Sequence, residues 1–307
     1  MRLKPWLFLA LLALGTALLL FGIYFYRHRF VRSDADMLAL LPHNPGSTIF
    51  FVDVKTLRRT GVLGLLAGSK RAEESDYRDF VTQTRFDYTK SVDTIAGSAD
   101  QAGFFLLVRG RFDWTKLRGY TLAHGGACKQ SSCAVPATKP GHWISFTAIQ
   151  PDVAGVALSS NATSAERLRS PRRGVIPRPM PAEPVWVDVS PALLKNPLAL
   201  PTLLRIFAIS IQSADAVRLS LGPAVQGSAA IFNLRLDAQC PNVAMAEAIR
   251  NQLQIETKML SLELAREHRQ PNSADLTGLM TSGMFESAGK RVTGRWPIRK
   301  ELLNGIE

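Results

Sequence analysis

The sequence is poor in cysteine and histidine, and these shortages exclude several classes of protein. Three cysteines in 307 residues are too few for a small protein held together by disulfides. The five histidines form no H-E-x-x-H pair, and we predict no metal site and no cofactor site. G-x-S-x-G and G-x-G-x-x-G motifs are also absent. Ser287-Ala288-Gly289-Lys290 matches S-x-x-K but lacks the companion motifs of that chemistry, so we predict no catalytic residue.

Acidic residues are the other shortage, with 25 of them against 37 basic residues and a net charge of +12. Such a balance often indicates a nucleic-acid partner. Here the excess lies on both sides of the first apolar run and in one later proline-rich segment, while the remaining parts are nearly neutral. Zinc-finger spacing and a basic helix are lacking as well, so we predict contact with anionic lipid headgroups and no nucleic-acid partner.

The most prominent feature is an uncharged run from Pro5 to Tyr26. A helix of this length spans roughly 33 Å at about 1.5 Å per residue, which predicts a single-pass membrane helix in contact with lipid over residues 5–26. A cleaved signal peptide is the alternative, but Gly15 and Ala17 are followed by further apolar residues instead of a polar cleavage region. We favour the inner (cytoplasmic) membrane, with the bulk of the chain in the periplasm.

Composition divides the chain into four segments. Five prolines between residues 169 and 184 exclude regular helix and sheet there, and this stretch is either a linker or a strap across one continuous fold. The predicted segments are a membrane anchor with basic flanks (1–32), a first α+β unit (33–168), the Pro/Arg-rich linker (169–184) and a second α+β unit (185–307).

The two units share a local pattern. Val185–Val189 repeats the apolar strand with an internal aspartate that is seen in Phe50–Val54, and in both units a leucine-rich helix, two strands and another helix follow. We therefore predict an α+β fold in which the transmembrane helix precedes two duplicated β-α-β-β-α units with antiparallel sheets. Coincidence is the alternative, because the matching pattern is short.

Charged residues inside predicted strands are candidates for chemistry. Arg109 and Arg111 point to the same side of an extended chain and could hold a phosphate or a carboxylate, or they are a solvent-facing pair beside Asp113. Asp53 and Asp188 each lie in an apolar strand, where we expect them to cap a helix or make a structural hydrogen bond instead of acting as acid or base.

Cys128 and Cys133 lie in a glycine-rich loop with four residues between them. This spacing allows a disulfide, which suits an oxidising compartment. Free thiols are one alternative, and zinc held with His124 or His142 is another. We favour the disulfide and expect Cys240 to be unpaired and buried.

Residues 242–268 form the longest predicted helix outside the anchor, and this helix carries an apolar stripe. The stripe either packs on the helix's own sheet or provides a face for a protein partner or a second copy of the chain. Its candidate contact residues are Val243, Ile249, Leu253, Leu260 and Leu264.

The segment Leu41-Pro42-His43-Asn44-Pro45, which leads into the strand at Ile49, resembles the opening of uncharacterised bacterial single-pass membrane-anchored envelope proteins. The resemblance covers about thirty residues and implies no catalytic residue. We therefore expect an envelope protein that binds or scaffolds a partner near the membrane. The alternatives are an envelope hydrolase, whose site would collect Asp or Glu with a His only in the fold, and a subunit of an inner-membrane assembly.

Overall fold

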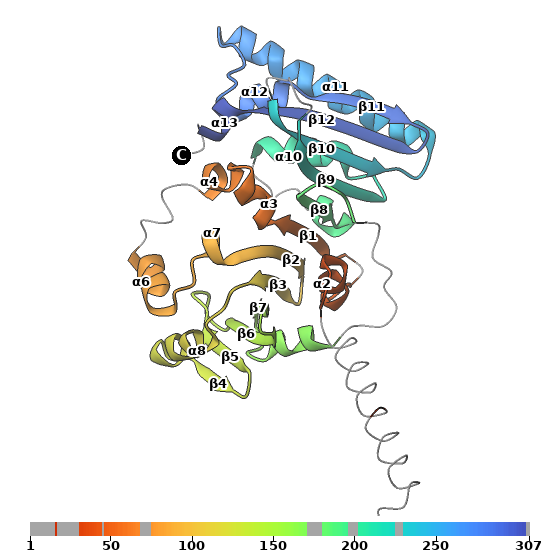
Figure 1. Cartoon of the computed structure of the whole chain (residues 1–307). Coiled ribbons are helices and arrows are strands. Elements are labelled where there is room, and N and C mark those ends of the chain that lie inside the picture. Colours follow the sequence, from red (N-terminus) through yellow and green to blue (C-terminus); the bar gives the residue numbers. More distant parts are fainter. Residues whose placement is uncertain are drawn as a thin grey trace, which may run out of the picture.

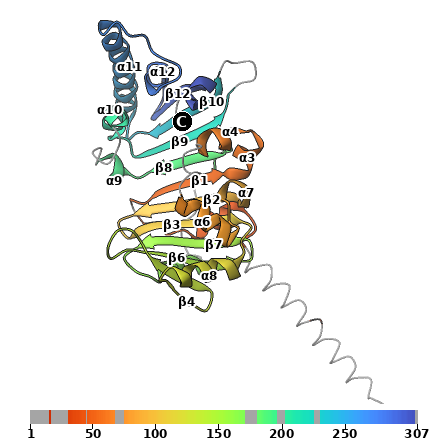
Figure 2. The same cartoon turned by 90° about the vertical axis from the view of Figure 1, so that its left-hand side faces the viewer.

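The described part of the chain forms one continuous antiparallel sheet of twelve strands, flanked by helices (Figures 1 and 2). The strand order is β11-β12-β10-β9-β8-β1-β2-β3-β7-β6-β5-β4. The computed structural model describes residues 16, 31–44, 46–67, 75–170, 180–195, 202–224 and 230–304.

The strands and helices have the following bounds. The strands are β1 (Thr48–Asp53), β2 (Val92–Asp100), β3 (Gly103–Gly110), β4 (Ala127–Lys129), β5 (Ser132–Pro136), β6 (Trp143–Gln150), β7 (Val153–Ser159), β8 (Val185–Val189), β9 (Ala216–Pro223), β10 (Ala230–Gln239), β11 (Met284–Ala288) and β12 (Arg291–Arg299). The helices are α2 (Asp34–Leu40), α3 (Val54–Arg59), α4 (Val62–Ala67), α6 (Ser75–Thr84), α7 (Tyr88–Ser91), α8 (Trp114–Ala123), the 3-10 helix η1 (Ser164–Arg169), α9 (Pro191–Leu194), α10 (Thr202–Ile211), α11 (Val243–Arg266), α12 (Leu276–Thr281) and α13 (Lys300–Asn304).

The predicted fold class is wrong in two respects. No helix in the described part of the chain is long and apolar enough to cross a membrane, and the predicted anchor, residues 5–26, lies outside that part apart from Thr16. The two predicted units also do not have separate sheets, because β1 and β8 pair directly and join all strands into one sheet. The mixture of helices with antiparallel strands is confirmed.

The sheet has two halves, one with strands β1 to β7 and one with strands β8 to β12. They join through the antiparallel pairing of two apolar strands, β1 and β8. Phe51 on β1 lies opposite Trp186 on β8, and their rings stack with centroids 5.8 Å apart. Both rings are nearly inaccessible, at 4% and 3% exposure. Because β1 and β8 are central strands with neighbours on both edges, their apolar sequences suit burial.

The strand order repeats on each side of this join. The first half runs β1-β2-β3-β7-β6, and the second runs β8-β9-β10-β12-β11. In each half a helix follows the third strand, α8 after β3 and α11 after β10. The first half differs by the β4-β5 hairpin, which extends its edge of the sheet.

The two faces of the sheet are covered differently. On one face α3 and α4 pack over the centre, and α10 and α11 pack over the second half. On the other face α2 and η1 cover the first half, where they bury Met37, Leu41 and Leu168 against Phe51 and Phe105. Figure 1 shows α2 on the opposite side of the sheet from α3, α4 and α6. No described helix packs on this second face over β9, β10, β11 and β12.

Candidate binding groove

The uncovered part of the sheet forms a groove of about 850 Å³. Its floor is built by β9, β10, β11 and β12, and residues 180–183, which lead into β8, form one wall. A volume of this size is within the range of ligand sites in proteins, roughly 300–1,000 Å³. Four of the lining residues are arginines and three are carboxylates. They are Arg218, Arg235, Arg291, Arg295, Glu183, Asp237 and Glu286.

The alternation of side chains along β12 explains why the groove is charged. Arg291, Thr293 and Arg295 are exposed on the groove side, whereas Val292 and Trp296 point to the opposite side and are buried under the helices. Strand residues two apart share a face, so a single polar-apolar alternation builds both the core and the groove floor.

One row of side chains across the floor is dominated by ion pairs. Asp188, Arg218 and Asp237 lie opposite one another on β8, β9 and β10. Arg218 donates from Nε and Nη2 to both carboxylate oxygens of Asp188, at 2.5 and 2.7 Å. Arg291 donates from Nε to Oδ1 of Asp237 at 2.7 Å, and from Nη2 to Oδ2. These hydrogen bonds raise the pKa of both arginines, and for Arg218 they outweigh the opposing effect of burial.

The next row contains two arginines directly opposite each other, Arg235 on β10 and Arg295 on β12. Arg235 donates from Nη1 to Oε1 of Glu183 at 2.8 Å. Arg295 contacts the thioether sulfur of Met284 at 3.8 Å, and no ion pair in the described part of the chain includes it. At the other end of this row lies Trp186 on β8, and its ring centroid is 5.2 Å from the guanidinium of Arg218 in the preceding row.

The structure does not bring Arg109 and Arg111 together as an anion site. Arg109 donates to Asp34 at 2.8 Å and to the carbonyl of Ser33 at 3.3 Å, so it holds the start of α2 against the sheet. Arg111 lies beyond the end of β3 and donates to the carbonyl of Lys90. Each guanidinium thus stabilises a different segment of the first half.

The predicted stripe on α11 is divided between core and surface. Ile249, Leu253 and Leu264 are buried, and Ile249 and Leu253 belong to the core under β9, β10 and β12. Leu260 is half-buried and Val243 is 48% exposed. Three of the five residues therefore pack within the chain, where a partner cannot reach them.

The two aspartates in the central strands have structural roles. Asp53 caps α3 by accepting hydrogen bonds from the backbone N–H of Thr56 at 2.8 Å and from its hydroxyl at 2.7 Å. Asp188 pairs with Arg218, as described above. These are the helix cap and the structural contact that the sequence predicts.

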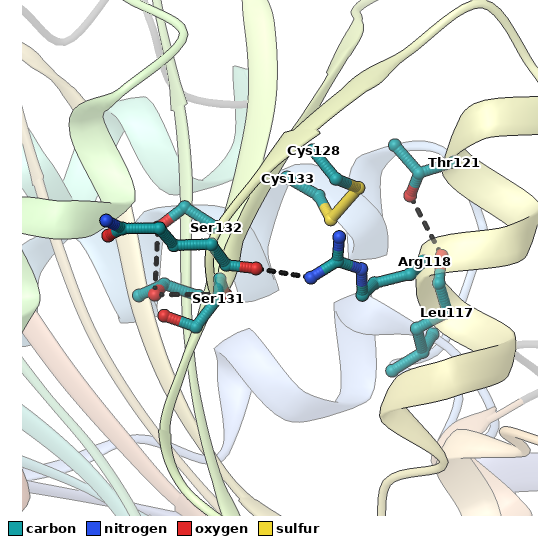
Figure 3. The surroundings of a disulfide bond; sticks show 9 residues. Leu117, Arg118, Thr121, Cys128, Ser131, Ser132 and Cys133 are labelled. Carbon is teal, nitrogen blue, oxygen red and sulfur yellow. Dashed lines mark hydrogen bonds between the residues drawn. A yellow bond between two sulfur atoms is a disulfide. The ribbon is translucent and has the colours of Figure 1, made fainter.

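Cys128 and Cys133 form a disulfide that joins β4 to β5. They are opposite one another in the hairpin, with Cα atoms 4.0 Å apart. Figure 3 shows the side chain of Arg118 on α8 reaching the hairpin, where it donates to the carbonyl of Gln130. Cys240 is free and buried, and burial raises the pKa of its thiol, followed by a smaller effect of Asp215.

We expect alkylation of the unfolded chain to modify Cys240 alone before reduction and all three cysteines after it, because the other two form the disulfide. Replacing Cys128 and Cys133 by serine should lower the free energy of unfolding by roughly 2 kcal/mol, the loop-closure entropy of so short a loop. Hydrogen exchange should show lost protection mainly in β4 and β5. Three reactive thiols without reductant would contradict the disulfide. The variant Cys240→Ala, with the disulfide intact, is the control for exchange in the hairpin.

The sequence alone did not predict the residues that line the groove. Their only local signal is the alternation of charged with apolar residues in Arg235–Asp237 and Arg291–Arg295, which is also what a strand with one solvent-facing side would show. In the described part of the chain, no group of three or more His, Cys, Asp or Glu side chains is placed to hold a metal ion.

Comparison with known proteins gives a likeness of fold alone. No protein-family model matches the chain, and no curated protein does. Among solved structures, crystal form III of TP0453 is similar with a TM-score of 0.50 and 13% identity, over 90% of this chain and 99% of that chain. Crystal form I of the same protein gives a TM-score of 0.47, also at 13% identity, over 90% and 97% of the two chains.

Proposed function

We propose that this protein is a non-catalytic binding or scaffolding protein of the bacterial envelope, and that the groove over β9, β10, β11 and β12 contacts its partner. The main support for the proposal is that the described helices cover only one half of this face of the sheet. The first half of that face is buried under α2 and η1, whereas the second half leaves an open charged groove. Concave surfaces with a few convergent polar groups are the usual sites of binding.

The chemistry of the groove favours binding over hydrolysis. An envelope hydrolase would need a free carboxylate together with a second carboxylate or a histidine to transfer protons. Two of the three lining carboxylates, Glu183 and Asp237, are engaged with arginines, which leaves Glu286 without a second free carboxylate or a histidine among the residues that line the groove. Guanidinium groups held in ion pairs position a ligand but do not move protons near neutral pH.

The disulfide supports a location outside the cytoplasm. Disulfides persist in oxidising compartments such as the bacterial periplasm and are rare in the cytosol. Cys133 is 3% exposed, so the disulfide is part of the packed edge of the sheet. A periplasmic position for residues 33–307 is therefore part of the proposal.

Photo-crosslinking in intact cells tests this function. A photoreactive phenylalanine analogue replaces Thr293, which is exposed on the groove floor, and a matched variant carries it at Lys258, which is exposed on α11. We expect the Thr293 variant to yield a discrete crosslinked protein adduct and the Lys258 variant to yield none, because the groove and α11 lie on opposite faces of the sheet. The absence of an adduct at Thr293, or the same adducts at both positions, would refute the proposal.

A further inference from the structure

We propose that the groove recognises a polypeptide segment through an acidic side chain, which binds between Arg295 and Arg235. This inference rests on the proposed function and names the chemistry of the partner. Its basis is the pairing of the two arginines, which lie directly opposite each other on adjacent strands. Like charges in that position repel each other unless an anion lies between them.

The charge around this pair is incompletely balanced. Glu183 compensates Arg235, and its side chain is only 19% exposed. Arg295 is exposed and has the sulfur of Met284 as its polar contact, and a thioether is a weak acceptor. The guanidinium of Arg295 therefore keeps most of its N–H donors available, in the planar arrangement that suits a carboxylate.

The other charged groups in the groove do not supply that carboxylate. Asp188 and Asp237 are engaged by Arg218 and Arg291, respectively. Glu286 lies one strand away, opposite Thr293, and forms no ion pair within the described part of the chain. The lining residues as a whole include one more arginine than carboxylates.

The polarity of the floor favours a peptide over a lipid. An acyl chain laid across the groove would remove water from Arg218, Arg235, Arg291 and Asp237 without replacing their hydrogen bonds, which is unfavourable. A peptide offers backbone N–H and C=O groups to such a floor. It can also place an apolar side chain against Met180 and Met284, which are 42% and 46% exposed.

Selection from a random dodecapeptide library tests the inference. The folded protein and the variant Arg295→Glu are each used as bait, and Arg266→Glu is the matched control, since Arg266 is an exposed arginine on α11. We expect the protein and the Arg266→Glu variant to select peptides with Asp or Glu at one fixed position. The Arg295→Glu variant should bind those peptides roughly tenfold to hundredfold more weakly, the effect of losing a charge-assisted hydrogen bond.

For a second variant we expect the affinity for acidic peptides to rise instead of fall. Glu183→Gln frees Arg235 from its carboxylate partner, so the affinity for the selected acidic peptides, measured by fluorescence anisotropy, should rise by about threefold to tenfold. A purely structural role of Arg235 and Glu183 would not produce tighter binding. Arg295 is exposed, so its replacement should leave the melting temperature nearly unchanged.

Several outcomes would overturn the inference. The first is a neutral or basic consensus, and the second is equal affinity for the Arg295→Glu and Arg266→Glu variants. The third is binding to vesicles that contain phosphatidylglycerol, lost in Arg295→Glu, without selection of acidic peptides. If one of these occurs while Thr293 still crosslinks to a protein in cells, the inference fails but the proposed function stands. If Thr293 forms no adduct, the proposed function itself fails.

Discussion

Replacing Trp186 by alanine is expected to lower the free energy of unfolding by about 3–5 kcal/mol, the typical cost of removing a large buried aromatic side chain. Trp186 is 3% exposed and stacks on Phe51 across the pairing of β8 with β1. It also lies under the guanidinium of Arg218. The change would therefore leave a cavity where the two halves of the sheet meet, and urea unfolding followed by circular dichroism measures the loss.

The variant Trp186→Phe is the matched control. It keeps an aromatic ring beside Phe51 and removes an indole N–H that has no hydrogen-bond partner in the described part of the chain. We expect this variant to lose only about 1 kcal/mol, because a partly volume-conserving change leaves a smaller cavity. Equal losses for the phenylalanine and alanine variants would show that the ring stack does not stabilise the join.

The second large effect is expected at the ion pair between Asp188 and Arg218. Their side chains are 22% and 20% exposed, and Arg218 donates two hydrogen bonds to Asp188. Asp188→Ala leaves the guanidinium in a partly buried place without its main carboxylate, and we expect a loss of about 2–3 kcal/mol in the free energy of unfolding. This is less than for a fully buried pair, because Asp237 and Glu183 still attract Arg218 and water reaches the site.

A double-mutant cycle separates the pair from its surroundings. Replacing both Asp188 by leucine and Arg218 by methionine should cost less than replacing Asp188 alone, because no unpaired charge then remains. Thermal and urea unfolding of the two single variants and the double variant measure the coupling. If the loss of unfolding free energy in the double variant equals the sum of the losses in the two single variants, the ion pair contributes nothing beyond its two separate side chains.

Local sequence patterns were sufficient to predict β1, β8 and α11. The apolar strands predicted at Phe50–Val54 and Val185–Val189 agree closely with β1 and β8, and the helix predicted over residues 242–268 is α11, which Asn242 caps. Such features depend on neighbours within a few residues, namely the two-residue alternation of strands and the side-chain oxygens that cap helices. The disulfide between Cys128 and Cys133 is also local, since the hairpin places them opposite each other.

The hairpin of β11 and β12 was missed for an equally physical reason. Ser287-Ala288-Gly289-Lys290 matches S-x-x-K in the sequence, whereas in the structure it spans the turn between these strands, with Gly289 at φ +57°. Gly294 and Pro297 inside β12 are poor strand formers, and their place in the sheet comes from pairing with β10.

The sequence by itself determined where most strands and helices form, the cap at Asp53 and the closure of the disulfide, because each depends on residues close together in the chain. Only the tertiary structure decided that β1 pairs with β8, since that contact joins residues far apart in sequence and apolar strands do not encode which partner they choose. The tertiary structure also decided that α2 and η1 cover one half of a face and leave the other half open. The pairing of β10 with β9 and with β12 collects the arginines of these strands into a groove that no local pattern reveals.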